Sequence, residues 1–339
     1  MAINVAINGF GRIGRMVFRA AMNDRMINVV AVNDLTDNET LAHLLKYDSV
    51  HGKLKEDVTF SDSVLKVGKK EIKVFSERDP ANLPWKKLKI DVVVESTGFF
   101  RDPVKAATHL TAGAKKVIIS APCKCEAKTV CPTDTTTIVL GVNQKGYKKK
   151  KHNIVSNASC TTNCVAPILK VLEDNIGIKR CFFTTIHAYT ADQRIVDGPH
   201  KDLRRARAAA QNIVPTSSGA DVATVQAIPS LSGKLRGSAI RIPIPDGSIT
   251  DFTIEMNKDV TVEKINKLFK KQAMGRFKGI IEYSEDNLVS TDILGNPHSA
   301  IFDSKLTKVV DRKFLKIVAW YDNEWGYSCR MVDLIKLIA

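Results

Sequence analysis

The sequence predicts an α/β protein of two parts, with a doubly wound, mostly parallel sheet in the first half and an α+β domain with a large, mostly antiparallel sheet in the second. Apolar strand patterns alternate with helical patterns up to about residue 155, which is typical of a parallel sheet covered by helices. After residue 180 strand patterns dominate. The 339 residues, 44% of them hydrophobic, are enough for two domains with their own cores.

The chain opens with a strand pattern at 3–7, a glycine-rich turn, and a helical pattern from Met16. Gly9, Gly11 and Gly14 give the spacing G-x-G-x-x-G between strand and helix. The first glycine permits the tight turn, the second lets a pyrophosphate approach the backbone, and the third lets the helix pack on the strand. This context predicts a Rossmann-type dinucleotide site.

Asp34 supports that prediction. It ends a second strand pattern (27–32) and lies 20 residues after Gly14, where a carboxylate binds the ribose hydroxyls of the adenosine half. A carboxylate there repels a 2′-phosphate, so NAD is favoured over NADP. The alternative is an ordinary strand–turn–helix unit that binds no ligand.

Further elements follow the same alternation. We expect helices at 36–47 and 103–112, a hairpin at 64–75, and strands at 90–95, 117–120 and 137–142. Ligands bind at the carboxyl ends of the strands in such sheets. The segments expected at that edge are Gly9 to Gly14, Asp34, Ser96-Thr97-Gly98 and Ser120.

Cys160 lies where a strand pattern (153–156) gives way to a helical pattern starting near residue 165. A helix N-terminus offers free N–H groups and the positive end of the helix dipole, which favour an anion. We therefore expect a thiol with a lowered pKa that acts as a nucleophile. Cys164, four residues later, either resolves an oxidised Cys160 or simply packs within the helix.

The second half carries further polar candidates. A strand at 181–186 ends at His187, and a long polar stretch follows to about residue 212. A loop of this length without regular structure is usually functional. Ser218 and Gly219 precede a helix at 220–227, which is another candidate anion site. The remaining elements expected are strands at 238–242, 249–256, 280–283 and 314–321, and helices at 262–272 and 328–338.

The formal net charge of +15 attracts anions, both phosphorylated metabolites and nucleic acid. A run of lysines at 148–151 forms either a solvated turn or a nucleic-acid contact. A second basic group, which is either a solvated face or functional, consists of Arg204, Arg205 and Arg207. No recognised nucleic-acid fold or pattern of base-stacking aromatic residues accompanies the charge.

Seven cysteines and no secretory signal favour reduced thiols and a cytoplasmic location. Cys123, Cys125 and Cys131 are either loop thiols or a soft-metal site, and we expect no metal because no second pair at zinc-finger spacing accompanies them. No apolar run is long enough to cross a bilayer.

Four motifs together identify a family. They are Asn-Gly-Phe-Gly-Arg-Ile-Gly-Arg at 8–15, Ser-Asn-Ala-Ser-Cys-Thr-Thr-Asn-Cys at 156–164, His-Ala-Tyr-Thr at 187–190 and Trp-Tyr-Asp-Asn-Glu at 320–324. With these motifs the chain resembles, nearly end to end, the phosphorylating NAD-dependent glyceraldehyde-3-phosphate dehydrogenases. The nine-residue cysteine motif is specific.

The resemblance implies roles for individual residues. It makes Cys160 the nucleophile and His187 its base. For the cofactor it implies Gly9, Phe10, Gly11, Arg12, Ile13, Gly14, Asp34, Arg78, Thr97, Ser120 and Asn323, with Arg12 and Ile13 at the pyrophosphate and Asn323 at the nicotinamide amide. For inorganic phosphate it implies Ser159, Thr161, Ser218 and Gly219, and for the substrate's own phosphate Thr190 and Arg241. Arg207 falls in a basic loop that, in the family, packs against a neighbouring subunit's cofactor.

The resemblance also implies a homotetramer and two domains. These are an NAD-binding domain of residues 1–157 with a C-terminal helix returning to it (323–339), and a catalytic domain of residues 158–322 that includes the long loop near 188–212. One departure is Ser218, where the family often has threonine; serine keeps the hydroxyl, so phosphate binding should survive.

The implied reaction oxidises and phosphorylates D-glyceraldehyde 3-phosphate to 1,3-bisphosphoglycerate in glycolysis or gluconeogenesis. Two alternatives remain. A relative that acts on erythrose 4-phosphate would share the thiol–histidine chemistry, although that group has Glu where Asp34 stands. A secondary role in nucleic-acid binding would follow from the basic charge, although nucleic acid is not expected as the main partner.

Overall fold

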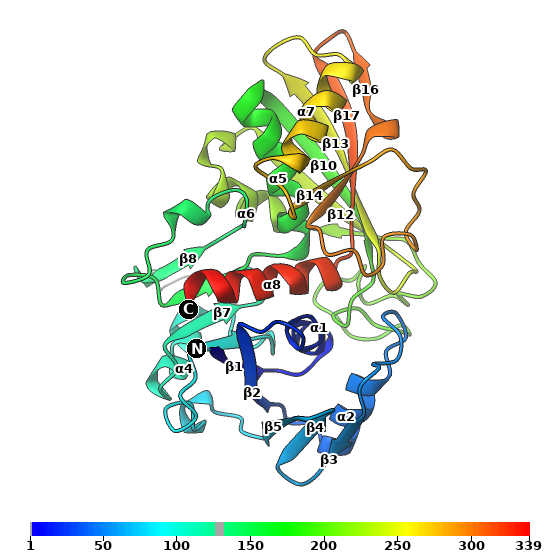
Figure 1. Ribbon diagram of the computed structural model, residues 1–339. Helices are drawn as coiled ribbons and strands as arrows, with labels where there is room; N and C mark the ends of the chain where they lie inside the picture. The colour runs from blue at the N-terminus through cyan, green and yellow to red at the C-terminus, as the bar shows by residue number, and fades with distance from the viewer. Residues whose placement is uncertain (1, 126–131) are drawn as a thin grey trace. The chain divides into compact units, whose positions relative to one another are not determined.

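The computed structural model describes residues 2–125 and 132–339 and divides them into two compact units. Of the described residues, unit 1 comprises 2–125, 132–138, 145–158 and 328–339, and unit 2 comprises 139–144 and 159–327. Each unit contains one large sheet, and Figure 1 labels the elements that build it.

The sheet of unit 1 has the strand order β3-β4-β5-β2-β1-β6-β7-β9-β8 in the described residues. Its strands are β1 (Ile3–Asn8), β2 (Ile27–Asn33), β3 (Val58–Phe60), β4 (Val64–Val67), β5 (Lys70–Phe75), β6 (Val92–Glu95), β7 (Lys116–Ile119), β8 (Thr135–Thr137) and β9 (Ile154–Ser156). The core from β5 to β9 is parallel, and only the β3-β4-β5 edge is antiparallel. This is the doubly wound arrangement that the sequence predicts, with β1 at the point where the strand order reverses.

The helices of unit 1 begin with α1 (Arg12–Ala21), which packs on β2, and α2 (Asn38–Lys46), which packs on β3. The helix predicted at 103–112 is interrupted into α3 (Pro103–Ala106) and α4 (Thr108–Thr111). Thr108 donates its hydroxyl to the carbonyl of Lys105 at 2.7 Å, a side-chain bond that competes with the helical pattern.

The prediction of a strand at 137–142 is also wrong, because the observed strand ends where the predicted one begins. The strand β8 ends at Thr137, and the chain then turns back, with the Val142 amide bonded to the Val139 carbonyl. Gly141 at φ +84° takes the left-handed conformation that this turn requires, which a continued strand would not allow.

The sheet of unit 2 is mostly antiparallel, as predicted, in the order β11-β12-β10-β13-β17-β15-β14, with β16 paired to β17. Its strands are β10 (Ile178–Ala188), β11 (Val214–Ser217), β12 (Leu235–Ile242), β13 (Ser248–Met256), β14 (Ile281–Ser284), β15 (Ala300–Asp303), β16 (Lys308–Val310) and β17 (Phe314–Tyr321). Two pairs, β10 with β12 and β14 with β15, are parallel.

The helix α5 (Cys160–Asn175) packs on this sheet against β10, β13, β15 and β17 and also contacts α6 (Ala220–Ala227) (Figure 1). Eleven of its sixteen residues are buried, so α5 is a core helix and its first turn is held rigidly. The helix α7 (Val262–Met274) packs on β14, and α8 (Trp325–Ile338) ends the chain.

The basic run of unit 1 binds its own chain. Lys149 donates to the carbonyl oxygen of Ala339, and the Tyr147 hydroxyl donates to that of Ile338 at 3.1 Å. Cys125 is disulfide-bonded, so the expectation of reduced thiols is wrong for this residue, while Cys123 is free. Cys131, the third member of the predicted group, lies outside the described residues.

None of the described helices combines the length and the apolar character that a bilayer crossing requires.

Candidate active site

The glycine turn of unit 1 is built by close backbone contacts. Gly9 has φ +89°, and a Cβ on it would lie 2.6 Å from the Thr97 nitrogen. A Cβ on Gly14 would lie 2.1 Å from the Gly9 oxygen, whereas nothing lies within 4 Å of a Cβ on Gly11. These contacts match the three predicted roles: a strained turn, an open approach for a ligand, and tight packing of helix on strand.

Asp34 lies beside this turn. Its carboxylate accepts a hydrogen bond from the Phe10 amide at 2.7 Å and from the Thr36 amide at 3.0 Å, so its orientation is fixed. The helix α1 begins at Arg12 and no side chain caps it, and the N-terminus of a helix favours an anion.

A cavity of about 460 Å³ opens at this edge of the sheet, and Gly9, Gly11, Asp34, Arg78 and Thr97 line it. A smaller cavity of about 190 Å³ is lined by Ile13, Thr97 and Ser120 among others. An open approach at Gly11, an uncapped helix and an oriented carboxylate are the features that bind the pyrophosphate and ribose of a dinucleotide, so the residues present fit NAD.

Two predicted cofactor residues face elsewhere. The Phe10 ring is fully buried and packs edge-on against Phe18 with centroids 5.8 Å apart, so only its backbone can serve a ligand. The Arg12 guanidinium forms an ion pair with Asp48 at 2.5 Å. Although burial raises the pKa of Asp48, the amides of His51 and Val50 and then Arg12 hold it below its ordinary value. The guanidinium of Arg12 is thus engaged by Asp48 within unit 1.

In unit 2, Cys160 is the first residue of α5, as predicted, with Ser159 as the N-cap that accepts from the Thr162 amide at 3.0 Å. The Sγ atom of Cys160 lies 3.4 Å from Nε2 of His187. His187 comes from β10, whose parallel pairing with β12 places it opposite Arg241. Strand register therefore brings together a thiol, an imidazole and a guanidinium that are distant in sequence.

Close polar contacts on the other side of the His187 ring fix its orientation. Nδ1 lies 2.7 Å from the Ala188 carbonyl oxygen, which can only accept. Nη1 of Arg241, which can only donate, lies 2.7 Å from Nδ1 and 3.0 Å from the same oxygen. The Ala188 oxygen needs a proton on Nδ1, whereas Arg241 needs a lone pair there, so these contacts hold the ring in place without selecting one neutral tautomer. Nε2 faces the sulfur in either case.

Burial and the Arg241 charge lower the pKa of His187 to about 3, so the ring is neutral at physiological pH. Burial also raises the pKa of Cys160, although Arg241 and the Thr161 amide act in the opposite direction. The predicted lowering of the pKa of Cys160 is therefore wrong for the protein without ligands, because desolvation outweighs the helix N-terminus. The resting pair is a neutral thiol beside a neutral imidazole base.

Three residues that the sequence interpretation missed hold this pair. The Tyr321 hydroxyl lies 2.7 Å from Thr185 Oγ1 and 3.1 Å from Thr161 Oγ1, and its ring packs edge-on against His187. Ser248 accepts from the Ala188 amide and donates to Asn323 Oδ1 at 2.6 Å, which leaves the Asn323 amide nitrogen to donate to a ligand. Alternation along β10 places Thr185 on the His187 face, a signal that was available in the sequence.

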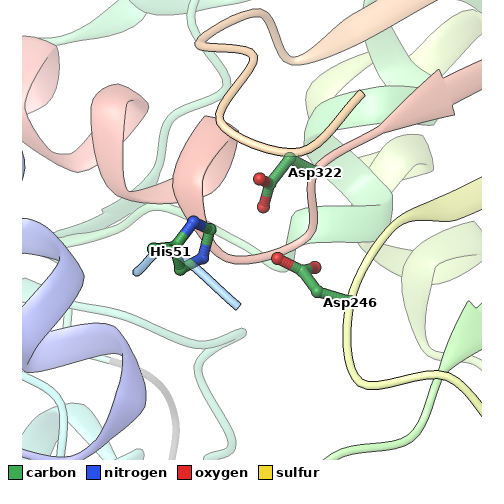
Figure 2. A group of neighbouring side chains, drawn as sticks. All are labelled: His51, Asp246 and Asp322. Carbon is green, nitrogen blue, oxygen red and sulfur yellow. The ribbon is translucent and has the colours of Figure 1, made fainter. Parts of the chain in front are cut away.

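Asp322, next to Asn323, has its side chain beside that of Asp246 (Figure 2). Carboxyl oxygens of the two lie within 4.8 Å of one another, and burial together with Asp246 raises the pKa of Asp322 to about 7. The Asp322 carboxyl also accepts from the amides of Gly295, Glu324 and Trp325, which fixes the turn that carries Asn323.

The other predicted residues lie at the surface or in loops of unit 2. Ser218 and Gly219 precede α6, with Ser218 Oγ accepting from the Ala220 amide at 3.2 Å. Thr190 is half-buried at the start of the long loop. Arg207 is paired with Asp197 at 2.9 Å and Arg205 with Asp192 at 2.6 Å, so acidic residues of the same loop already neutralise part of its charge.

Comparisons with known proteins agree with this geometry. Residues 3–103 match the model of the glyceraldehyde 3-phosphate dehydrogenase NAD binding domain, and residues 159–323 match that of its C-terminal domain. The chain is 56% identical to glyceraldehyde-3-phosphate dehydrogenase of Geobacillus stearothermophilus, over 100% of this chain and 99% of the relative. It is 55% identical to glyceraldehyde-3-phosphate dehydrogenase 1 of Bacillus subtilis with the same coverage, and 54% identical to glyceraldehyde-3-phosphate dehydrogenase 2 of Streptomyces avermitilis over 98% of each chain. The chain therefore belongs to the glyceraldehyde-3-phosphate dehydrogenase family of NAD-dependent oxidoreductases.

Proposed function

We propose that this protein catalyses the oxidative phosphorylation of D-glyceraldehyde 3-phosphate to 1,3-bisphosphoglycerate, in glycolysis or gluconeogenesis, with Cys160 as nucleophile and His187 as base. The observation that carries the proposal is the 3.4 Å approach of Nε2 of His187 to the thiol at the start of α5. The names of the relatives supply the substrate.

Cys160 adds to the aldehyde carbon while His187 takes the thiol proton and returns it to the former carbonyl oxygen, which gives the hemithioacetal and a neutral imidazole. NAD⁺, when bound, accepts the hydride of the oxidation. His187 removes the proton of the hemithioacetal hydroxyl at this step, a general-base contribution of roughly 10²–10⁴. The product is a thioester on Cys160, which conserves the free energy of oxidation.

Inorganic phosphate then attacks the thioester carbon, the C–S bond breaks, and the acyl phosphate leaves. Ser159, Thr161, Ser218 and Gly219 are the proposed ligands of this phosphate. The buried Nε of Arg241 has no hydrogen-bond partner within the described part of the chain, which supports Arg241 and Thr190 as the site of the substrate's own phosphate. Asn323 is the proposed ligand of the nicotinamide amide.

We further propose a cytoplasmic homotetramer in which the loop bearing Arg207 packs against a neighbouring subunit. The exposed apolar side chains of this loop, Ile195, Val196 and Leu203, each more than 70% accessible, support burial against a second copy. Residues 1–157 with 323–339 would be the NAD-binding domain and residues 158–322 the catalytic domain. Gel filtration with light scattering tests the tetramer.

The direct test of function is a steady-state assay of NAD reduction that omits aldehyde, NAD⁺ and phosphate in turn. Turnover that needs all three supports the phosphorylating assignment, and phosphate-independent turnover contradicts it. The same assay with erythrose 4-phosphate separates the alternative substrate, and a higher kcat/KM for that aldehyde would overturn our choice. No specific observation in the described residues favours nucleic-acid binding; a gel shift at physiological salt tests that role.

A further inference from the structure

Glu95 is a buried carboxylate with four hydrogen-bond donors around it. It ends β6 and is 2% exposed. One oxygen accepts from Asn8 Nδ2 at 2.6 Å and from His109 Nε2 at 3.1 Å. The other accepts from the Thr97 amide at 2.8 Å and the Thr97 hydroxyl at 2.5 Å. These four donors satisfy the carboxylate oxygens that burial removes from water.

His109 is fixed as a donor to this carboxylate. The Trp85 indole nitrogen, which can only donate, bonds to His109 Nδ1 at 3.0 Å. Nδ1 is therefore unprotonated, and the ring proton lies on Nε2, facing Glu95. His109 is fully buried, and its ring stacks with Trp85 and packs edge-on against Phe100.

The same chain of bonds reaches the ends of neighbouring strands. Asn8, at the end of β1, accepts at its Oδ1 from Asn33 Nδ2 at 2.6 Å. Asn33, at the end of β2, donates to the Glu77 carbonyl at 2.9 Å and accepts from the Glu77 amide at 2.8 Å. The 460 Å³ cavity is lined by Asn33, Glu77 and Thr97. The hydrogen-bond network through Glu95 and Asn8 therefore connects these three lining residues.

The cavity wall has little room to move. The Gly9 Cβ position lies 2.6 Å from the Thr97 nitrogen, and Ser96 donates its hydroxyl to the Gly9 oxygen at 2.7 Å. A shift of the turn at 95–97 would therefore move the glycine loop as well.

We propose that Glu95, oriented by His109, is the positioning residue of the NAD cavity. Glu95 is not among the described residues that line the 460 Å³ cavity, and it borders the smaller cavity beside Ile13 and Ser120. Its two oxygens fix the Thr97 turn on one side and the Asn8–Asn33–Glu77 chain on the other, and thereby set the distance between the cavity walls. This role concerns cofactor binding and is independent of the thiol chemistry proposed above.

The substitution Glu95→Gln tests the role because it preserves size and removes one acceptor. The new amide group faces two donors, Asn8 Nδ2 and His109 Nε2. If the Asn8 side-chain amide flips, its hydrogen bond with Asn33 is lost. If instead the His109 proton moves to Nδ1, the hydrogen bond from Trp85 is lost. We expect the Kd for NAD, measured by calorimetry on the purified enzyme, to rise roughly tenfold, with kcat at saturating NAD within about twofold of wild type.

An exchange variant supplies the rescue. In Glu95→Gln/Asn8→Asp the carboxylate is moved to position 8, where it can accept from Asn33, from His109 and from the amide introduced at position 95. The remaining oxygen at position 95 still accepts both Thr97 donors. We expect the double variant to bind NAD within about threefold of wild type, although Asn8→Asp alone, which sets two carboxylates face to face, weakens binding.

Lys116→Met is the matched control in the same unit. Lys116 is buried at the amino end of β7 and donates to the carbonyls of Lys149 and His152 and to the Asn153 side chain. Its loss should lower Tm and leave the Kd for NAD unchanged, because the amino ends of parallel strands lie at the opposite edge of the sheet.

Three outcomes would overturn the proposal: wild-type NAD affinity in Glu95→Gln, a double variant that binds no better than Glu95→Gln, or equal weakening in Lys116→Met. If Glu95→Gln is too unstable to purify, the double variant decides alone. Near wild-type affinity there supports the role of Glu95, and a tenfold loss or failure to fold contradicts it.

Discussion

The two sites differ in what makes them work. In unit 1, Gly9, Gly11 and the start of α1 present backbone, and Asp34 adds a carboxylate held by two backbone amides. In unit 2, Cys160, His187 and Arg241 bring ionisable side chains together in a buried place. Binding of the cofactor requires a cavity of fixed shape, and the backbone of the glycine turn provides it. Chemistry needs groups whose protonation the interior controls.

The comparison predicts that the two sites can be damaged separately. Cys160→Ala should lower kcat by at least about 10⁴ and leave the Kd for NAD within about twofold, because the thiol is the atom that reacts. Steady-state assay and calorimetry on the same preparation measure both. Cys164→Ala is the control: Cys164 is buried in the same helix and should affect stability rather than turnover. Substantial activity in Cys160→Ala would refute the nucleophile.

His187→Asn should lower kcat by roughly 10²–10⁴, because hydride loss then proceeds without a general base. The thiol remains, so a covalent adduct should still form, more slowly. Rapid mixing with aldehyde and NAD⁺, followed by mass spectrometry of the quenched enzyme, separates adduct formation from oxidation. If the oxidation step in this variant proceeds at the wild-type rate, His187 is not the general base and has only a structural role.

Asp34→Gly tests the unit 1 site. Without the carboxylate, repulsion of a 2′-phosphate disappears, and the ratio of kcat/KM for NADP to that for NAD should rise at least tenfold. The reactivity of Cys160 toward iodoacetamide should not change. An unaltered cofactor preference would show that Asp34 does not contact the ribose.

The smallest expected effect is a pH dependence of stability. His187 has a folded-state pKa of about 3, below its ordinary value of 6.5, so the unfolded chain binds a proton that the folded chain excludes. This contribution to stability is present above pH 6.5 and is lost as the pH falls toward 3, by up to about 1.4 kcal/mol per pH unit. Denaturant titrations at pH 7, 6 and 5 should show a shallower decline for His187→Asn, and parallel curves would contradict the neutral buried imidazole.

Local patterns predict most of the backbone elements and indicate Gly9 to Gly14, Asp34, Cys160 and His187 as candidates, whereas Arg241 and Asn323 follow only from the family resemblance. The glycine spacing predicts the turn because Gly9 and Gly14 lie where a Cβ would clash and Gly11 lies where the backbone is open. Cys160 begins α5, as its flanking patterns indicate. The pairing of His187 with Arg241 depends on the parallel register of β10 and β12 across some fifty residues, which no local pattern contains. Burial depends on the whole fold, and it reverses the expected shift in the pKa of Cys160.

Buried polar networks are hidden for the same reason. Glu95 reads as the end of an apolar strand and His109 as one residue of a short helix, and only the fold joins them to Trp85 and Asn8. Glu95 shapes the NAD cavity and takes no part in the reaction at Cys160. We therefore expect changes at Glu95 to alter cofactor affinity and changes at His187 to alter turnover.

The most direct test of the central claim, that Cys160 carries the acyl group between aldehyde and phosphate, is a single-turnover measurement without phosphate. Enzyme mixed with glyceraldehyde 3-phosphate and excess NAD⁺ should form one NADH per Cys160 in a rapid burst and then stall, and added phosphate should restart turnover. Continued NADH formation without phosphate, or the absence of a burst, would contradict the acyl-carrier account.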